Sequence, residues 1–270
     1  MKRAALGVAL ILLASGTAGA HRGPYTVSSL DQAVVQIDPG YQTMTQVASV
    51  PDPVIAIEYS RDGFIYGVNP FSDTLVKIDP ATAAVQIVGP LGFDLDFHAD
   101  LDEDDQGQLW MLESVVGGLY TIDRSTGTAT LQCQTDFPYI SGLAIADGTW
   151  WTTRLDWPNP PANPGCGLEF LLPDPANISE LETADDGWIY IRSAWFLPQF
   201  SHYTFSRYDP DSGTGEALGD FVFFWGELSG ITFNPNDQPS PNIPALGWPG
   251  IVVLVLLVTA SGIGMLLRRG

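Results

Sequence analysis

Short apolar stretches alternate with polar turns from residue 24 to residue 237. The segment 117–154, GGLYTIDRSTGTATLQCQTDFPYISGLAIADGTWWTTR, contains apolar runs at 119–123, 128–133 and 140–146 and a last run ending at Trp151. The turns between them are rich in Gly, Asp, Ser and Thr, which punctuate β-strands. We therefore expect this segment to form four short antiparallel strands of one sheet.

The same pattern recurs along the chain. Four aspartates end equivalent strands at steps of 41, 44 and 86 residues, and the last step is twice 43: Asp38, Asp79, Asp123 and Asp209. A single four-stranded sheet has two apolar faces and must stack between neighbours to bury both. A repeat near 43 residues is therefore typical of a β-propeller blade. Residues 23–237 have the length of five such units, of which the fourth is the least regular.

The first and last units complement each other. The last unit stops at Asp237 without its final strand, whereas residues 24–28 form a surplus strand that aligns with residues 64–68. We therefore predict that the N-terminal strand completes the last blade and closes the ring, which removes exposed sheet edges. The predicted fold is all-β, a five-bladed β-propeller closed by the N-terminal strand.

Two segments of the repeat resemble a known group of proteins. Residues 74–89 (TLVKIDPATAAVQIVG) and 119–131 (LYTIDRSTGTATL) are similar to YVTN, NHL and lactonase-like propeller repeats. The resemblance covers nearly the whole of residues 21–237 and implies the fold. It does not select a chemistry, because these propellers include binding scaffolds and enzymes alike.

Apolar segments at both ends predict export and membrane anchoring. Residues 1–20 contain Lys2 and Arg3, an apolar run and a small-residue ending, which is the pattern of a signal peptide. Residues 251–267 carry no charge, and together with 245–250 they are long enough for a transmembrane helix. We divide the chain into a signal helix (1–20), a propeller ectodomain (21–237), a Pro-rich linker (238–244) and a membrane anchor or sorting tail (245–270).

The tail resembles the PEP-CTERM and IPTL-CTERM class of bacterial sorting signals. Its matching residues are Ile243, Pro244, Ala245, Leu246, Arg268 and Arg269. The resemblance implies a Gram-negative cell envelope and a sorting or processing machinery. The protein would be exported and either anchored in the inner membrane or processed to the outer surface, and a plain C-terminal anchor is the alternative.

The ectodomain is strongly acidic. All 31 acidic residues fall between Asp31 and Asp237, against seven basic residues in 21–242, which gives this part a formal charge of −24. Such a surface repels phosphate backbones and excludes nucleic-acid binding. The two cysteines, Cys133 and Cys166, are expected to form a disulfide in an oxidising envelope.

Five acidic residues carry the candidate chemistry. The strand before each Asp-Gly turn should line the central channel, and its middle position is apolar in every unit: Ile57, Leu101, Leu143, Leu181 and Ile231. Side chains alternate along a strand, so the flanking acids should face the axis: Glu58, Asp100, Asp102, Glu180 and Glu182. Carboxylates gathered in this way predict a metal site for a hard cation such as Ca²⁺. The alternative is that they face water or pair with arginines.

The longer loops should share the other face of the disc from the tight turns. They are rich in aromatic residues, including Phe71 and Phe97, and the predicted ligand face consists of Trp157, Trp195, Phe221, Phe224 and Trp225. Such residues either plug the top of the barrel or offer a stacking surface to a glycan, peptide or protein ligand.

No nucleophile, phosphate-loop or zinc motif occurs in the sequence. The primary interpretation is therefore a non-enzymatic binding or scaffold module anchored at the cell surface. The alternative is a secreted, carboxylate-dependent hydrolase of glycosidase or lactonase type, with Glu58, Asp100 and Glu180 as its catalytic residues.

Overall fold

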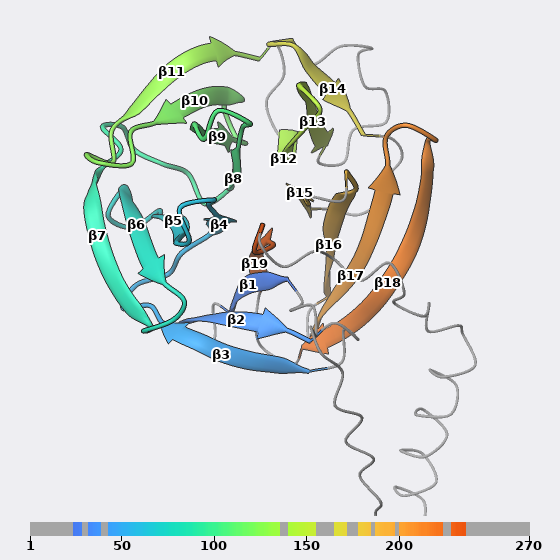
Figure 1. The fold of residues 1–270 in the computed structure, drawn as a ribbon, viewed down its shortest axis with the longest axis horizontal. Helices are drawn as coiled ribbons and strands as arrows, with labels where there is room; N and C mark the ends of the chain where they lie inside the picture. The colour runs from blue at the N-terminus through green and yellow to red at the C-terminus, as the bar shows by residue number, and fades with distance from the viewer. Residues whose placement is uncertain are drawn as a thin grey trace, which may run out of the picture.

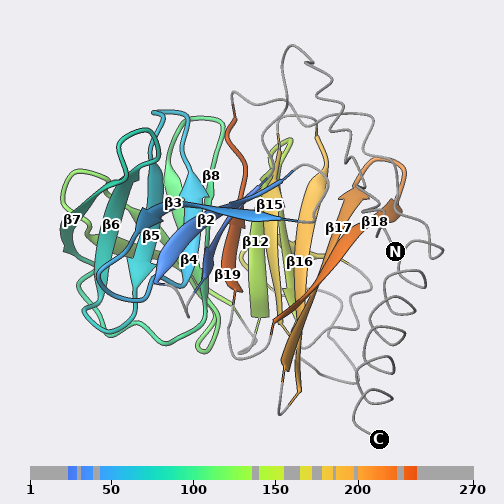
Figure 2. The same ribbon diagram turned by 90° about the horizontal axis from the view of Figure 1, so that it is seen from below.

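The computed structural model describes residues 24–28, 32–38, 43–135, 140–154, 165–171, 178–184, 187–197, 200–223 and 228–235. These residues form nineteen strands in five sheets. The sheets stand around a common axis in a disc, seen along the axis in Figure 1 and from its edge in Figure 2. The all-β, five-bladed propeller is thus confirmed.

The two terminal segments lie outside this description. They include the predicted signal peptide (1–20), the linker (238–244) and the tail with its sorting motif (245–270). Within the described ranges, no helix is long and apolar enough to cross a bilayer.

Each blade is one antiparallel sheet, with one exception in blade 4. The strands are β1 (Tyr25–Ser28), β2 (Ala33–Ile37), β3 (Met44–Ser49), β4 (Ala56–Tyr59), β5 (Ile65–Asn69), β6 (Thr74–Asp79), β7 (Ala84–Pro90), β8 (Ala99–Glu103), β9 (Leu109–Glu113), β10 (Gly118–Ile122), β11 (Ala129–Gln134), β12 (Ile140–Ala146), β13 (Thr149–Arg154), β14 (Leu168–Phe170), β15 (Ile178–Thr183), β16 (Ile189–Leu197), β17 (Phe200–Asp209), β18 (Thr214–Phe223) and β19 (Leu228–Thr232). Blade 1 has the order β19-β1-β2-β3, and blades 2, 3 and 5 contain β4–β7, β8–β11 and β15–β18. Blade 4 has three described strands, and its β14 runs parallel to β13.

The ring closes as predicted, through the N-terminal strand. β1 lies between β19 and β2 and pairs antiparallel with both, with Tyr25 opposite Thr232. The Thr26 hydroxyl also donates a hydrogen bond of 2.6 Å to the carbonyl of Gly230. Blade 1 is therefore assembled from strands that lie some 200 residues apart in the sequence, and it has no exposed edge along this seam.

The segment 117–154 does not form one sheet, contrary to the expectation from its pattern. β10 and β11 belong to blade 3, whereas β12 and β13 begin blade 4. The four strands are consecutive, but β11 lies at the rim of the disc and β12 lies near its axis (Figure 1). Local turn chemistry predicts the strands but does not reveal at which turn a new sheet begins.

The predicted disulfide between Cys133 and Cys166 is present. It joins β11, the outer strand of blade 3, to the residues just before β14 of blade 4. The irregular blade is thereby tied covalently to its neighbour.

The core consists of five apolar clusters between neighbouring blades. Each contains one member of the predicted apolar column: Ile57, Leu101, Leu143, Leu181 and Ile231, all at most 1% exposed. Burying one such side chain contributes about 1.5–3 kcal/mol. Because these residues are buried between blades, they fix the orientation of the inner strands β4, β8, β12, β15 and β19. They thereby determine which side chains of these strands face the axis.

Candidate functional site

All five predicted carboxylates are buried near the axis. Glu58, Asp100, Asp102, Glu180 and Glu182 are between 1% and 7% exposed. They flank the apolar column on β4, β8 and β15, so the alternation of side chains along each strand directs them away from the inter-blade clusters. A buried carboxylate needs hydrogen bonds or a counter-charge. The five residues differ in whether they have them.

Asp100 is satisfied by backbone amides. Its Oδ2 accepts hydrogen bonds from the amides of Leu143 (2.9 Å) and Leu181 (3.1 Å), and its Oδ1 accepts one from the amide of Leu101. Burial and the neighbouring Glu180 raise the pKa of Asp100 well above its ordinary value, and the amides partly oppose this shift. Asp100 therefore ties the inner strands of blades 3, 4 and 5 together.

Glu180 is satisfied by an arginine. Arg192, which is 2% exposed and lies opposite Glu180 on β16, forms a buried ion pair with it, and its Nε donates a hydrogen bond of 2.7 Å to Oε2. Burial raises the pKa of Glu180, and Arg192 lowers it. Pairing with an arginine was the alternative that the sequence left open, and it holds for this one residue.

The remaining three carboxylates converge on one another. Each of Glu58, Asp102 and Glu182 offers an oxygen atom, and these atoms all lie within 4.8 Å of one another. Asp102 is held by the amides of Ile145 and Glu103, each at 2.6 Å. We call these three residues the axial trio.

A threonine lies between two members of the axial trio. The Thr232 hydroxyl lies 3.2 Å from Oε2 of Glu58 and 3.1 Å from Oε1 of Glu182, and it accepts a hydrogen bond of 2.7 Å from the Tyr59 amide. The second oxygen of Glu182 is buried without a hydrogen-bond partner. Buried polar atoms without partners are uncommon, and this oxygen is one of five such side-chain atoms among the described residues.

The electrostatics of the axial trio favour protons or a cation. Burial raises the pKa of Glu58 to about 8, and the negative charge of Glu103 adds to the shift while hydrogen bonds from Glu182 and Thr232 oppose it. Burial, followed by the charge of Glu58, raises the pKa of Asp102 and of Glu182 well above their ordinary values. Three ionised carboxylates at this spacing repel one another unless something positive lies between them.

The axial trio opens into a small polar cavity of about 190 Å³. The cavity lies on the face of the tight inner turns, and its wall includes Arg61, Asp105, Asp147 and Asn234. Arg61 forms an exposed ion pair of 3.2 Å with Asp105 across two neighbouring turns. Sites for drug-sized ligands usually enclose about 300–1,000 Å³, so this cavity suits a small molecule or an ion with its waters.

The three residues of the alternative catalytic set predicted from sequence have different environments. Glu58 belongs to the axial trio, whereas Asp100 is bonded to amides and Glu180 to Arg192. Sequence reasoning also missed Thr232. Its signal was present in the repeat alignment, because Thr232 occupies the same position after the apolar column as Glu58 and Glu182.

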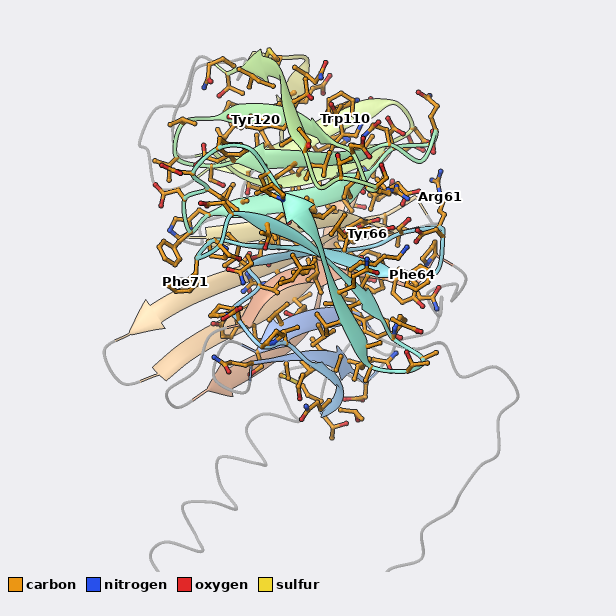
Figure 3. The ribbon with its side chains drawn as sticks, turned by 90° about the vertical axis from the view of Figure 1, so that its left-hand side faces the viewer. Arg61, Phe64, Tyr66, Phe71, Trp110 and Tyr120 are labelled. Atoms are coloured by element: carbon orange, nitrogen blue, oxygen red, sulfur yellow. A yellow bond between two sulfur atoms is a disulfide. The ribbon has the colours of Figure 1, made fainter. Side chains whose placement is uncertain are left out.

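The predicted ligand face is only partly described. Trp195 lies on β16 and Phe221 on β18, and nothing is described of their side chains, whereas Trp157, Phe224 and Trp225 lie outside the described residues. Among the described loop aromatics, Phe71 and Phe97 are 65% and 52% exposed and contact each other edge-on, with ring centroids 5.1 Å apart. In Figure 3, Phe71 and the cavity residue Arg61 lie on opposite faces of the disc.

Phe93, another loop aromatic, has a different environment. It packs against the inter-blade core and stacks on Tyr120 at a centroid distance of 4.6 Å. Phe93 therefore belongs to the packing between blades 2 and 3, whereas Phe71 and Phe97 remain on the surface.

Comparison with known proteins supports the fold. No protein-family model matches the chain, and no curated protein is significantly similar to it in sequence. Among solved structures, a gluconolactonase from Xanthomonas campestris is 12% identical with a TM-score of 0.50, over 81% of this chain and 82% of that one. A chain of a nidogen–laminin complex is 10% identical (TM-score 0.48, 78% and 98% covered), and the calcium-binding protein regucalcin from Agrobacterium tumefaciens is 17% identical (TM-score 0.42, 82% and 77% covered). At these identities the likeness concerns the fold alone, and on the gluconolactonase comparison the chain has a lactonase-like β-propeller fold.

Proposed function

We propose that the protein is a Ca²⁺-dependent hydrolase of small lactones or esters, with the cavity above the axial trio as its active site. The observation that carries the proposal is the convergence of Glu58, Asp102 and Glu182, all buried, on one point at the floor of a small polar cavity. Titratable groups that perturb one another inside a cleft are typical of functional sites. Amides hold Asp102, but one buried oxygen of Glu182 has no hydrogen-bond partner.

The donor set fits a hard cation. All ligand atoms are oxygens, which Ca²⁺ prefers at 2.3–2.6 Å, and oxygens on opposite sides of such an ion are then about 4.6–5.2 Å apart. The spacing within 4.8 Å and the unpartnered oxygen of Glu182 agree with this requirement. Glu58, Asp102 and Glu182 would hold the ion, and a bound ion of this kind polarises a carbonyl group or acidifies a water molecule.

Residues of the cavity wall would contact a substrate bound beside the ion. Asp147, from the turn between β12 and β13, and Asn234, just after β19, line the wall and offer polar groups to a substrate. Arg61 is held in place by Asp105 and by the carbonyl of Asp104. A volume of about 190 Å³ favours a substrate no larger than a small sugar derivative and disfavours a polymer.

Two considerations select lactone or ester hydrolysis over glycoside hydrolysis. Glycosidases need two carboxyl groups flanking the scissile bond, whereas Asp100 is bonded to backbone amides and Glu180 to Arg192. The similarity to a gluconolactonase supports the lactonase alternative at the level of the fold.

The test is a hydrolysis assay on a panel of small lactones and esters, with added Ca²⁺ and with a chelator. We expect activity that requires Ca²⁺ and falls more than about tenfold in Glu182→Gln, because loss of a residue that only orients a metal ligand already costs about 10–100-fold. Asp211→Asn, which changes an exposed acid of the β17–β18 turn, is the matched control and should retain activity. Hydrolysis that survives both chelation and Glu182→Gln would contradict the proposal.

A binding role for the opposite face is the second candidate function. It is favoured by the exposed Phe71–Phe97 pair, since exposed aromatic rings provide stacking surfaces for sugars and peptides. Glycan and peptide arrays probed with the protein and with a Phe71→Ala, Phe97→Ala double variant test this role. Loss of a specific array signal in the double variant supports it, and identical profiles argue against it.

We also propose that the protein is held in the bacterial envelope through residues 245–270. The support is the uncharged run 251–267 followed by Arg268 and Arg269. Fractionation of cells expressing the full chain and a chain ending at residue 237 tests it. Membrane association of both chains, or of neither, would contradict the proposal.

A further inference from the structure

The cavity above the axial trio has a predominantly acidic wall. Arg61 is the only basic residue among the wall residues that the structure describes. The acidic residues of the wall number six: Glu58, Asp102, Glu103, Asp105, Asp147 and Glu182. The described wall therefore has a formal charge of −5, and a Ca²⁺ ion on the axial trio would still leave it at −3. The cavity stays negative with its proposed ion in place.

The single arginine of the described wall is already engaged. Arg61 forms its ion pair with Asp105 at 3.2 Å, and it also donates a hydrogen bond to the carbonyl of Asp104. Glu103 is paired at 2.8 Å with Arg124, which lies outside the described wall. An anionic substrate would thus meet repulsion, and the described wall offers it no unpaired cation.

Asp147 differs from these paired acids. It lies in the tight turn between β12 and β13, where its φ of +49° is a left-handed conformation that Asp and Asn adopt more readily than most residues. Its side chain is exposed and takes part in none of the hydrogen bonds or ion pairs of the described residues. Because the axial trio is buried at the floor of the cavity, a substrate that reacts there would place its outer group nearer Asp147.

The wall also contains an aromatic ring. Phe233 lines the cavity and packs against Tyr190, with ring centroids 4.3 Å apart. Further apolar surface comes from Ala146, Ala184 and Pro235. Aromatic rings attract cations, and apolar side chains accommodate methyl groups. Together with a carboxylate, this wall suits an alkylammonium group.

We infer that the cavity selects small esters or lactones that carry an alkylammonium group over neutral and anionic ones, and that Asp147 determines this preference. The inference rests on the proposed hydrolase function and specifies its substrate class. A cavity lined by negative charge raises the local concentration of a positively charged substrate. The unpaired carboxylate at the exposed end of the wall then attracts the bound cation directly.

The experiment uses two matched pairs of substrates. Acetylcholine and 3,3-dimethylbutyl acetate have the same shape and differ in one positive charge, and γ-butyrolactones bearing a trimethylammonio or a tert-butyl group form the second pair. The ratio of kcat/KM for the cationic over the neutral member is measured in the wild type and in Asp147→Asn. Comparing the two proteins cancels the intrinsic reactivity of each substrate.

Asp147→Asn removes the charge and keeps a residue type that tolerates the left-handed turn. We expect the ratio to fall about fivefold, the factor equivalent to about 1 kcal/mol for two unit charges about 4 Å apart in water. The change should appear mainly as a higher KM for the cationic member, because its charge is present in the bound substrate and in the transition state alike. Arg61→Gln removes the partner of Asp105 from the wall and should raise the ratio.

Asp211→Asn is the matched control, because it removes an exposed acid of the β17–β18 turn rather than one of the cavity wall. Its ratio should equal that of the wild type. A readout without chemistry is the dissociation constant of the methyl ethers of choline and of 3,3-dimethylbutanol, measured by ligand-observed NMR. The wild type should bind the choline ether more tightly, and Asp147→Asn should reduce the difference.

The outcomes separate this inference from the proposed function. Equal affinity of the wild type for the two ethers overturns the preference while the hydrolase function stands. An equal fall of the ratio in Asp147→Asn and Asp211→Asn, or no fall in Asp147→Asn, overturns the role of Asp147. Absence of hydrolysis in both pairs and across the lactone and ester panel overturns the proposed function and this inference together.

Discussion

Burying each acidic side chain at the axis costs desolvation free energy, and different groups offset this cost for different residues. Amide groups from three blades compensate Asp100, and Arg192 compensates Glu180. In the axial trio, amides satisfy Asp102, whereas one oxygen of Glu182 has no partner and its neighbours are acidic. Four other buried side-chain atoms of the described residues also lack partners, so the distinguishing feature of Glu182 is its position among acidic neighbours.

Neutralising one member of the axial trio should therefore stabilise the metal-free protein. Glu182→Gln keeps the shape and removes one charge, so we expect a higher melting temperature than wild type at pH 8 in the presence of a chelator. Added Ca²⁺ should raise the melting temperature of the wild type and not that of the variant. Differential scanning fluorimetry measures both.

The contrasting control is Glu180→Gln. It leaves the buried Arg192 without its counter-charge, and loss of one partner from a buried ion pair costs about 3–5 kcal/mol. This variant should melt well below wild type. A Glu182→Gln variant that also melts lower in chelator would show that the axial trio is stabilising, against the argument above.

The stability of the metal-free protein should fall as pH rises. The pKa of Glu58 is raised to about 8 in the folded state from an ordinary value of 4.5, so between these values the folded chain keeps a proton that the unfolded chain has lost. Stability is then complete below about pH 4.5 and declines up to about pH 8, by at most about 1.4 kcal/mol per pH unit for one proton. Urea unfolding in chelator from pH 5 to pH 8 measures the slope, and Glu58→Gln should reduce it. A slope that is flat or rising in the wild type is the contrary result.

At the scale of the elements, side chains take over hydrogen bonding where the inner strands diverge. Asp100 reaches the amides of β12 and β15, Asp102 reaches an amide of β12, and Thr232 reaches an amide of β4. These bonds connect blades whose backbones do not pair with one another. The acidic residues on β8 therefore have a structural role that their sequence alone does not distinguish from a catalytic one.

Asp100→Ala should be strongly destabilising for this reason. It leaves the buried amides of Leu143 and Leu181 without an acceptor, and each unsatisfied group costs about 1–3 kcal/mol. Asp100→Asn keeps one acceptor oxygen and should cost clearly less. Equilibrium unfolding in urea compares the two, and equal stability of both variants with wild type would mean that the amides find other partners.

The disulfide belongs to the same scale, since it ties the irregular blade 4 to blade 3. Cys133 and Cys166 are 33 residues apart, and closing a loop of this length reduces the entropy of the unfolded chain by about 3–4 kcal/mol in free-energy terms. A Cys133→Ser, Cys166→Ser variant should unfold at a lower urea concentration. Hydrogen exchange should rise first in β13 and β14, and faster exchange spread evenly over all five blades would be the contrary finding.

At the scale of the whole molecule, the periodicity of the sequence was sufficient to predict most of the fold. The 43-residue spacing and the surplus strand at residues 24–28 led to five blades and to the closing seam, because both are properties of sequence order. The sheet boundary between β11 and β12 was missed, since consecutive strands look alike whether or not they pair. Turn residues report local conformation and say little about position along the radius of the disc.

The candidate site was predictable to a smaller extent. Alternation along the inner strands placed all five acids at the axis, and their burial agrees with it. Which acids are satisfied depends on Arg192, on amides of other blades and on Thr232, whose contact with Glu58 joins residues 174 positions apart. Such contacts join residues that are far apart in the sequence and become adjacent only in the closed ring, so the sequence pattern does not predict them.

The seam between β1 and β19 has a consequence for the order of events at the ribosome. β1 emerges early and has no inner neighbour until β19 has been made, so the nascent chain holds an unfinished ring through most of translation. Thr232 arrives on that same closing strand, and a chain stopped before Leu228 would lack both the closure and the hydroxyl between the two glutamates. Closure of the ring and completion of the surroundings of Glu58 and Glu182 therefore depend on one and the same strand.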